Sequence, residues 1–251
     1  MTTSKEGRRD ISRTEFIAMM AALIALSALA IDIVLPALPD VAEAFSARSE
    51  NDQQLIISFY IVGLGLFQLV FGPLSDRYGR RGPLFAGLTL YLATGLLSVV
   101  ASDFTMLLAL RFLQGAGAAA TRAITQSIVR DRYAGKDMAK VMSLVQMVFI
   151  AIPVVAPGIG QLILLGGSWY FVFFFVAACA GALLVWTAIR LPETLDPEIR
   201  REITPRAVAA GFRTVLTHRT TMCYTLAATF VYGGFMAYIN LAQQIFVDLF
   251  G

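Results

Sequence analysis

Long apolar runs separated by short polar segments dominate the pattern along the chain. A helix needs about 20 residues to cross a hydrocarbon core about 30 Å thick. Runs of about this length occur at 16–39, 55–74, 83–101, 105–128, 141–165, 169–189 and 221–243. The pattern therefore predicts an all-α polytopic membrane protein, in which six transmembrane helices are followed by a seventh.

The balance of residue types agrees with this prediction. Of the 251 residues, 57% are hydrophobic and 15% are charged, whereas soluble domains average roughly 45–50% and about 25%. This balance excludes a soluble globular enzyme, a disordered chain and a fibrous repeat. Cys179 and Cys223 lie inside predicted spans, so a disulfide-built secreted fold is excluded as well. The net charge of +3 is too small to indicate nucleic acid as a partner.

The distribution of Lys and Arg predicts the orientation in the membrane. Seventeen of the 20 lie in the N-terminal tail or in the loops after the second, fourth and sixth runs, whereas the opposite loops contribute only Arg48. The positive-inside rule then places the N-terminus in the cytoplasm and the C-terminus outside. We expect four regions: a cytoplasmic tail (1–14), a six-helix transmembrane half (15–190), a cytoplasmic linker (191–219) and a seventh-helix region (220–251).

The linker contains a periodic pattern of its own. Apolar residues recur at the spacing of one helix face, with arginines that suit a headgroup region. These residues are Val208, Phe212, Val215 and Leu216, with Arg206 and Arg213. We expect a short amphipathic helix on the inner leaflet, and the alternative is an ordinary solvated linker.

Two charges inside the spans require an explanation. Asp32 lies seven residues before Pro39 in the first run, and Arg111 lies six or seven residues into the fourth. At 1.5 Å per residue, both lie about 10 Å below the outer surface. A charge near the centre of a span costs about 2.5–3.5 kcal/mol and usually faces the bundle interior. One interpretation is a structural ion pair, and the other is a proton-linked switch, because desolvation favours a neutral carboxyl whereas a nearby guanidinium favours the charged form.

The fourth run carries a narrow polar stripe. Arg122 lies eleven residues after Arg111, within about 20° of the same helix face, and Gln114 lies near that face. A stripe of this kind is unlike a lipid-facing surface. Arg122 either joins the charges at the cytoplasmic surface or extends to lipid headgroups, and the sequence leaves both options open.

The loop between the second and third runs has a specific pattern, Gly-x-Leu-x-Asp-Arg-x-Gly-Arg-Arg, over 72–81. Glycines supply the backbone freedom of a tight turn, and an acid among arginines allows a charge network at the membrane surface. We expect Gly72, Gly79 and Gly82 to form the turn. The charged members of the pattern are Asp76, Arg77, Arg80 and Arg81.

This loop resembles the signature between helices two and three of the major facilitator superfamily. The string AIDIVLPALPD around Asp32 resembles the first helix of the superfamily's bicyclomycin/chloramphenicol-type drug-efflux subfamily. LRFLQGAGAAA over 110–120 is similar to the superfamily's Arg-x-x-Gln-Gly signature, and RDRY over 130–133 and LPETL over 191–195 fit the subfamily. The resemblance runs from about residue 16 to residue 251.

The resemblance implies drug/proton antiport, in which small amphipathic drugs leave the cell across the bacterial inner membrane. The implied partners are a drug-like substrate, protons and the lipid bilayer, with no cofactor, no metal and no enzymatic activity. Asp32 would be the proton-coupling acid and would recognise cations, with Arg111 as its partner and Gln114 in the same site. The further candidates for a charge network are Arg122, Asp131 and Glu193.

The fifth run is also similar to a superfamily motif. APGIGQ over 156–161 resembles the antiporter signature Gly-Pro-x-x-Gly-Gly, although Ala156 and Gln161 depart from it. Proline and glycine also break helix regularity, so a packing kink is an equal interpretation. The residues concerned are Pro153, Pro157, Gly158 and Gly160.

The second half of the superfamily pattern is incomplete in this chain. The superfamily has twelve helices in two halves with the substrate cavity between them, whereas residues 220–251 match only the first helix of the second half. Three outcomes are open: pairing with a second chain that supplies the missing helices, self-association, or a non-transporting fragment with a structural or interaction role. A seven-helix receptor or light-driven protein is disfavoured, because the N-terminus is predicted inside and the seventh run lacks lysine.

Overall fold

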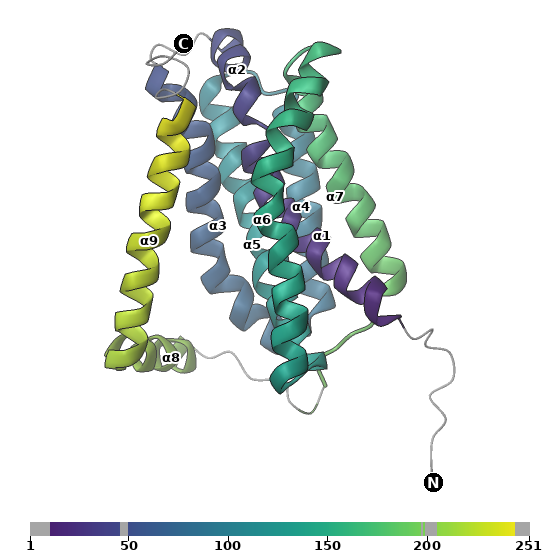
Figure 1. The fold of residues 1–251 in the computed structure, drawn as a ribbon, viewed down its shortest axis with the longest axis vertical. Coiled ribbons are helices and arrows are strands. Elements are labelled where there is room, and N and C mark those ends of the chain that lie inside the picture. Colours follow the sequence, from purple (N-terminus) through teal and green to yellow (C-terminus); the bar gives the residue numbers. More distant parts are fainter. Residues whose placement is uncertain (1–10, 46–49, 197, 199–204, 244–251) are drawn as a thin grey trace. The chain divides into compact units, whose positions relative to one another are not determined.

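A computed structural model describes residues 11–45, 50–196, 198 and 205–243. All regular elements in these ranges are helices (Figure 1), which confirms the all-α prediction. The chain divides into two compact units, Met1–Arg201 and Glu202–Gly251, and each is described by itself.

The first unit is a bundle of long helices. Each of the first six apolar runs contains most of one long helix, and the helices at the second, fourth and fifth runs extend beyond the run by several residues. The elements are α1 (Arg13–Asp32), η1 (Leu35–Ala37), α2 (Leu38–Ala44), α3 (Glu50–Tyr78), α4 (Arg81–Ser98), α5 (Phe104–Arg132), α6 (Gly135–Leu165) and α7 (Tyr170–Arg190).

Side-chain caps explain where two of these helices begin. The hydroxyl of Ser12 accepts a hydrogen bond from the Glu15 amide at 3.1 Å, immediately before α1. The carboxylate of Asp103 accepts one from the Met106 amide at 2.8 Å, immediately before α5. Each cap satisfies an amide that has no partner within its own helix.

The first helix ends earlier than the apolar run predicts. The run continues to Pro39, but α1 ends at Asp32 and is followed by η1 and α2. Pro36 and Pro39 lie at the starts of η1 and α2. A proline ring lacks the amide that would continue the preceding helix and fits the first turn of a new one. Asp32 is therefore the last residue of a helix, and not a residue in the middle of one.

Four helical segments of the described chain are long and apolar enough to cross a membrane: Arg13–Ala44, Asp52–Tyr78, Gly135–Leu165 and Tyr170–Arg190. The helix α4 does not meet this measure because it begins with Arg81 and contains several small or polar residues. The helix α5 does not meet it because it carries Arg111, Gln114 and Arg122. The predicted number of seven spans therefore stays a prediction.

The helix α5 packs closely against α3. A Cβ atom at Gly115 would overlap the backbone carbonyl of Tyr60, and one at Gly63 would overlap the carbonyl of Phe112. Glycine at these two positions lets the helix backbones approach each other, as in membrane helix pairs that pack through small residues. The close approach buries the polar stripe of α5 inside the bundle.

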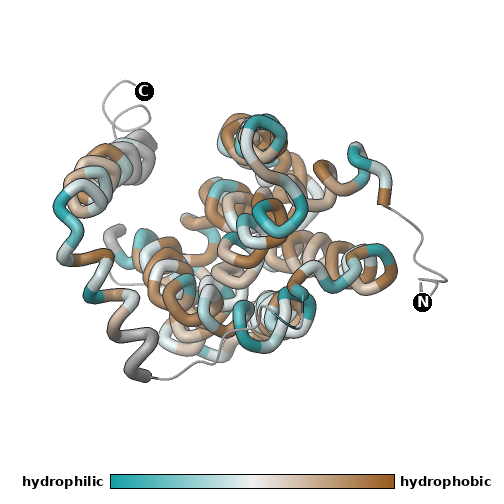
Figure 2. The backbone as a smooth tube through the Cα atoms, turned by 90° about the horizontal axis from the view of Figure 1, so that it is seen from below, coloured by the Kyte–Doolittle hydropathy of each residue, from teal (hydrophilic) through white to brown (hydrophobic). Residues whose placement is uncertain are grey.

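The outer surface of this unit is apolar. On α6, for example, Val154 is 82% exposed and Leu165 is 81% exposed. Figure 2 shows hydrophobic residues along the helices and hydrophilic residues mainly at their ends and turns. Apolar side chains exposed over this extent suit contact with lipid and not with water.

The described part of the second unit contains two helices, α8 (Pro205–Thr217) and α9 (Arg219–Gln243). A helix is therefore present in the linker, where the periodic pattern predicts it. The side chains of α9 that the structure describes are almost all exposed.

Candidate functional site

Arg111 is the largest fully buried side chain in the described part of the chain. Its guanidinium donates to the Ala30 carbonyl of α1 at 2.8 Å, to the Ile56 carbonyl of α3 at 3.3 Å and to the Gln114 side-chain oxygen at 2.7 Å. Buried charges are costly unless polar groups surround them. The guanidinium of Arg111 therefore joins its own helix, α5, to α1 and α3.

Two aromatic rings flank the same guanidinium. Its central carbon lies 4.8 Å from the ring centre of Tyr60 and 5.6 Å from that of Phe173. The negative face of an aromatic ring attracts a cation, and the attraction grows where water is absent. Both rings are buried, so they add to the stabilisation that the hydrogen bonds provide.

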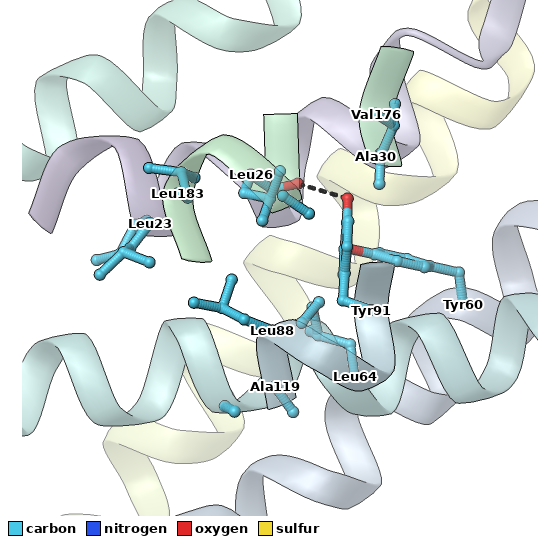
Figure 3. Close-up of a cluster of buried hydrophobic side chains, with 14 of the residues drawn as sticks. Leu23, Leu26, Ala30, Tyr60, Leu64, Leu88, Tyr91, Ala119, Val176 and Leu183 are labelled. Atoms are coloured by element: carbon cyan, nitrogen blue, oxygen red, sulfur yellow. Dashed lines mark hydrogen bonds between the residues drawn. The ribbon is translucent and has the colours of Figure 1, made fainter. Parts of the chain in front are cut away.

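The hydroxyls of two tyrosines bind the same stretch of α1. Tyr60 Oη donates to the Ser27 carbonyl at 2.9 Å, and Tyr91 Oη donates to the Leu26 carbonyl at 3.1 Å. Figure 3 shows the two rings side by side below α1, with the bond from Tyr91 to Leu26. Together with Arg111, these side chains form what we call the α1 anchor: donors from α3, α4 and α5 on carbonyls in the last two turns of α1.

Asp32 follows directly after the anchored turns. It is only 5% exposed, and its carboxylate has no hydrogen bond or ion pair among the described residues. The interpretation as a structural ion pair does not hold for this structure, because no ion pair within 4.0 Å joins Asp32 and Arg111. The physical reason is that two backbone carbonyls and Gln114 already accept from the guanidinium. Arg111 nevertheless reaches the level of Asp32 in the bundle, since it binds Ala30, two residues from Asp32.

Gln114 has one unsatisfied group. Its oxygen accepts from Arg111, but its amide nitrogen Nε2 is buried and has no partner among the described groups. This nitrogen lies 3.1 Å from where a Cβ atom would stand at Gly95 of α4. The polar stripe of α5 thus continues from Arg111 toward α4.

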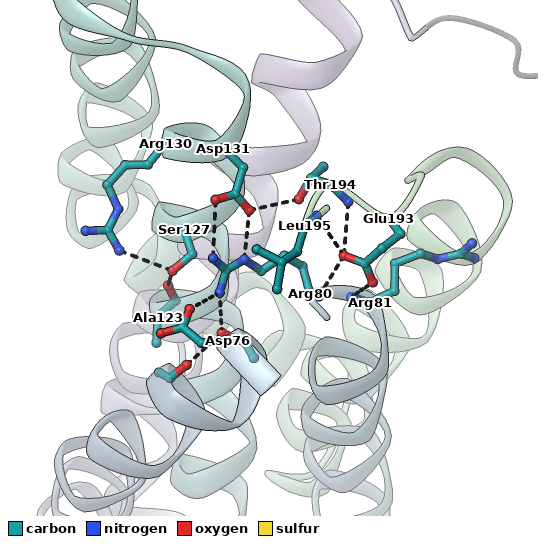
Figure 4. Close-up of polar contacts among 12 residues, drawn as sticks. Asp76, Arg80, Arg81, Ala123, Ser127, Arg130, Asp131, Glu193, Thr194 and Leu195 are labelled. Carbon is teal, nitrogen blue, oxygen red and sulfur yellow. Dashed lines mark hydrogen bonds and ion pairs between the residues drawn. The ribbon is translucent and has the colours of Figure 1, made fainter. Parts of the chain in front are cut away.

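A second polar cluster lies where α3 ends, α4 begins and α5 ends (Figure 4). Arg80 donates to both carboxylate oxygens of Asp131, at 2.8 and 3.2 Å, and to Asp76 at 2.6 Å. It also donates to the Ser75 hydroxyl at 2.8 Å. We call this set the Arg80 network, with Thr194, whose hydroxyl donates to Asp131 at 3.2 Å, as its fifth member.

The Arg80 side chain is only 7% exposed. Burial opposes its charge, but hydrogen bonds and charge attraction from Asp131 and Asp76 outweigh burial and raise the pKa of Arg80 above its ordinary value. Its charge is therefore permanent. Two carboxylates that share one guanidinium join the ends of α3 and α5 across the turn.

Glu193 caps the beginning of α4. Its carboxylate accepts from the amides of Arg80 at 2.8 Å and Arg81 at 3.2 Å, as well as from those of Thr194 and Leu195. Negative charge is favourable at a helix N-terminus, where amides lack partners. Burial opposes ionisation, but the four backbone hydrogen bonds outweigh it and lower the pKa of Glu193.

We expect the substitution Glu193→Gln to lower the free energy of unfolding by about 1 kcal/mol at pH 7, because an amide oxygen is a weaker acceptor and lacks charge. The contribution of the carboxylate is complete above the ordinary glutamate pKa of about 4.3. It is lost as the pH falls through the lowered pKa of the folded protein.

Thermal unfolding in detergent at pH 7 and at about pH 3 tests this expectation, with Glu198→Gln as the control because Glu198 is exposed and lies outside the cap. An equal effect of Glu193→Gln at both pH values would contradict the capping role.

The family of the chain follows from comparison with known proteins. The model of the Major Facilitator Superfamily matches residues 20–249. The chain belongs to this superfamily. Its members are transporters, so the prediction that the protein is not an enzyme is confirmed.

Relatives of this superfamily member come from several bacteria. It is 34% identical over 238 residues to an uncharacterized MFS-type transporter, YdgK, of Bacillus subtilis, covering 93% of this chain and 58% of YdgK. It is 27% identical to a bicyclomycin resistance protein homolog of Haemophilus influenzae, covering 94% and 59% of the two chains. It is 28% identical to the multidrug resistance protein MdtL of Escherichia coli, covering 95% and 60%.

The fold is also similar to a solved structure of the superfamily. The human organic anion transporter MFSD10 (TETRAN) superposes with a TM-score of 0.65 at 20% identity, covering 80% of this chain and 53% of that chain. The chain therefore spans about 60% of the length of the curated relatives and about half of this structure. The predicted superfamily half followed by part of a second half agrees with this coverage.

The structure corrects the predicted role of Gly72 in the loop between α3 and α4. The helix α3 continues through Gly72 and Pro73 to Tyr78, and Gly82 lies inside α4. Only Gly79 takes a positive φ, of 89°, in this turn. The turn is short because both helices extend beyond their apolar runs, so a single left-handed residue closes it.

Arg122 does not join the Arg80 network in this structure, and its extension to lipid headgroups stays a prediction. Its guanidinium lies over the ring of Phe149 on α6, 5.0 Å from the ring centre, and the residue is half-buried. The acids of the Arg80 network are already bound to Arg80. A cation–π contact is therefore the interaction that the bundle offers to Arg122.

The proline- and glycine-rich segment of α6 lies next to Asp32. A Cβ atom at Gly160 would overlap the carbonyl of Ile33, and Ala156, one turn earlier, is buried. Gly158, by contrast, has open space around it. The helix remains continuous through Pro153 and Pro157. Close packing of α6 on the end of α1 thus explains Gly160, whereas nothing in the structure explains Gly158.

Some important contacts could not be found from the sequence. Arg190 at the end of α7 donates to both carboxylate oxygens of Glu15 on α1 at 2.6 Å, although the residues are 175 positions apart. Phe173 lies in an aromatic run whose pattern fits lipid contact and packing equally, and it is only 1% exposed and packs on Arg111. Neither contact has a local pattern that would predict it.

Proposed function

We propose that the chain acts in proton-coupled export of small amphipathic drugs, by itself or as the N-terminal part of a longer exporter. In this proposal Asp32 carries the exchanged proton. The observation that carries it is a buried carboxyl group without a described partner, beside a buried cation that is held independently of it.

The α1 anchor makes proton exchange at Asp32 feasible. Arg111 is bound by Ala30, Ile56 and Gln114, so none of its hydrogen bonds breaks when Asp32 gains or loses a proton. Small changes in hydration or in bound substrate can therefore change the protonation of Asp32 without unfolding the site.

The names of two relatives support the substrate class. One is a bicyclomycin resistance protein homolog and one is a multidrug resistance protein. The proposal includes a cytoplasmic N-terminus and a bacterial inner membrane, which the Lys and Arg distribution and the relatives favour. The superfamily match and the four segments long and apolar enough to span a membrane support a multi-pass membrane protein.

A non-transporting role is the alternative. The observation that favours it is that the chain spans about 60% of its relatives' length, whereas a cavity between two halves needs both. In that case the bundle would serve as a structural or interaction module in the membrane.

Transport by the purified chain in lipid vesicles distinguishes these functions. We expect a pH gradient, acidic inside, to drive labelled bicyclomycin or chloramphenicol into the vesicles several-fold above protein-free vesicles. A protonophore should abolish this uptake. Insertion of the chain is checked separately, by protease protection. Gradient-independent uptake would overturn the proton coupling, and no uptake by an inserted chain would favour the alternative.

A further inference from the structure

The helix α8 (Pro205–Thr217) has an apolar face that no described residue of its own unit covers. Phe212, Val215 and Leu216 are 41%, 47% and 62% exposed. At 100° per residue these three positions fall within about 100° of one another, whereas Thr217 lies on the opposite side of the helix and Arg213 lies at the border of the apolar face, about 60° from Leu216. The face is narrow and has a cation at its border, as in helices that lie in a membrane interface with their cations at the headgroups.

The arrangement of α8 and α9 places this face at the level of a membrane surface. Within their unit, α8 lies across the beginning of α9 (Figure 1). At 25 residues, α9 is about 38 Å long and can cross a hydrocarbon core of about 30 Å. If α9 crosses the bilayer as predicted, α8 runs along the surface where α9 enters it.

The corner between the two helices is fixed by hydrogen bonds. The His218 amide donates to the Thr214 carbonyl at 3.1 Å, which closes α8, and the Met222 amide donates to the His218 carbonyl at 3.0 Å, which opens α9. The ring nitrogen Nδ1 of His218 lies 2.9 Å from the Thr221 hydroxyl. Because His218 is the single residue between the two helices, α8 is joined directly to α9 and not through a long linker.

The charge of residues 204–247 indicates which kind of membrane surface α8 fits. No acidic residue occurs between positions 204 and 247, whereas Arg206, Arg213 and Arg219 occur there. Near a membrane, each cation is worth about a fivefold gain in binding to anionic headgroups. An apolar face with uncompensated arginines beside it fits an anionic lipid surface better than a neutral one.

We propose that α8 is an interfacial arm that binds anionic phospholipid headgroups, with Phe212, Val215 and Leu216 in the upper acyl region and Arg213 among the phosphates. The arm would fix the depth of the start of α9 in the bilayer. This inference concerns the second unit alone, so it holds or fails independently of drug transport.

Spin-label depth measurements on the full chain test the proposal. The background carries Cys179→Ala and Cys223→Ala, because both cysteines would otherwise react with the label. Single labels are placed at Val215→Cys on the apolar face and Thr217→Cys on the polar face. The chain is reconstituted in two kinds of vesicle. Neutral vesicles contain phosphatidylcholine alone, and anionic vesicles contain phosphatidylcholine with about 30% phosphatidylglycerol.

We expect the label at position 215 to collide preferentially with oxygen in anionic vesicles, and the label at 217 to collide with a water-soluble nickel complex. The difference should shrink in neutral vesicles and at high salt, which screens headgroup attraction. Arg213→Glu should remove the difference between the two labels in anionic vesicles. The substitution changes the charge by two units, which should lower the ratio of membrane-bound to free α8 by roughly 25-fold. Lys136→Glu, an equal charge change at an exposed residue of α6, should leave the difference in place.

Three results would overturn the proposal. Equal access of the nickel complex to both positions would mean that α8 is a solvated linker. Shielding of position 215 from both collision partners would mean that protein covers the apolar face. The same depth in neutral and anionic vesicles would mean that anionic headgroups play no part.

Discussion

Asp32→Asn is expected to reduce pH-driven drug uptake to the level of vesicles without protein. Asparagine has nearly the shape of aspartate but cannot carry a proton at any pH in the experiment. Asp32 is buried in the last turn of α1 and has no hydrogen bond among the described residues that the substitution would break. The α1 anchor binds carbonyls and not this carboxylate, so the bundle should keep its fold.

Two measurements separate a lost proton carrier from a damaged protein. Exchange of labelled drug across vesicles at equal pH should persist in Asp32→Asn, because it requires binding but no net proton transfer. The matched control is Asp40→Asn, since Asp40 is an exposed carboxyl in the following helix α2. Unchanged gradient-driven uptake in Asp32→Asn would remove Asp32 from the mechanism, and an equal loss in Asp40→Asn would indicate a nonspecific effect.

Gly115→Ala should destabilise the bundle by about 2 kcal/mol or more, although alanine is the better helix former. The new methyl group would overlap the Tyr60 carbonyl and lie 3.0 Å from the Leu64 amide. Both are backbone groups that cannot rotate away, so α3 and α5 must separate, and interiors tolerate such overpacking poorly. Separation would also move Tyr60 away from Ser27 and Arg111.

Gly65→Ala provides the matched control on α3. A Cβ atom there meets nothing within 4 Å, so the substitution should be neutral or raise the free energy of unfolding by up to about 1 kcal/mol through helix propensity. Unfolding of the three proteins in detergent mixtures, followed by circular dichroism, gives the comparison. Equal stability of Gly115→Ala and Gly65→Ala would show that α3 and α5 do not pack as closely as described.

The long helices could be predicted from the sequence because lipid imposes a strong constraint. An apolar run of about 20 residues has few structural options other than a helix, and the first six runs all contain one. Helix ends were harder to predict, because capping and proline decide them. Pro36 and Pro39 end α1 at Asp32, although the apolar pattern continues past both.

The two polar clusters differ in how far sequence could predict them. The Arg80 network joins residues from three short motifs, so Asp76, Arg80 and Asp131 were candidates from the start, and the structure brings them together. Arg111 and Asp32 were also recognisable, as charges inside apolar runs. Their arrangement was not, because backbone carbonyls of Ala30 and Ile56 satisfy the guanidinium, and a sequence carries no sign of which carbonyls are free.

The α1 anchor limits how this half of the protein can move. Tyr60, Tyr91 and Arg111 attach the end of α1 to three neighbouring helices through buried hydrogen bonds. Sliding α1 past those neighbours would strip all three donors at once, in surroundings where water cannot replace them. If Asp32 is exposed first to one side of the membrane and then to the other, α1, α3, α4 and α5 must tilt together as one rigid block. The bending is then confined to the loops and the outer helices.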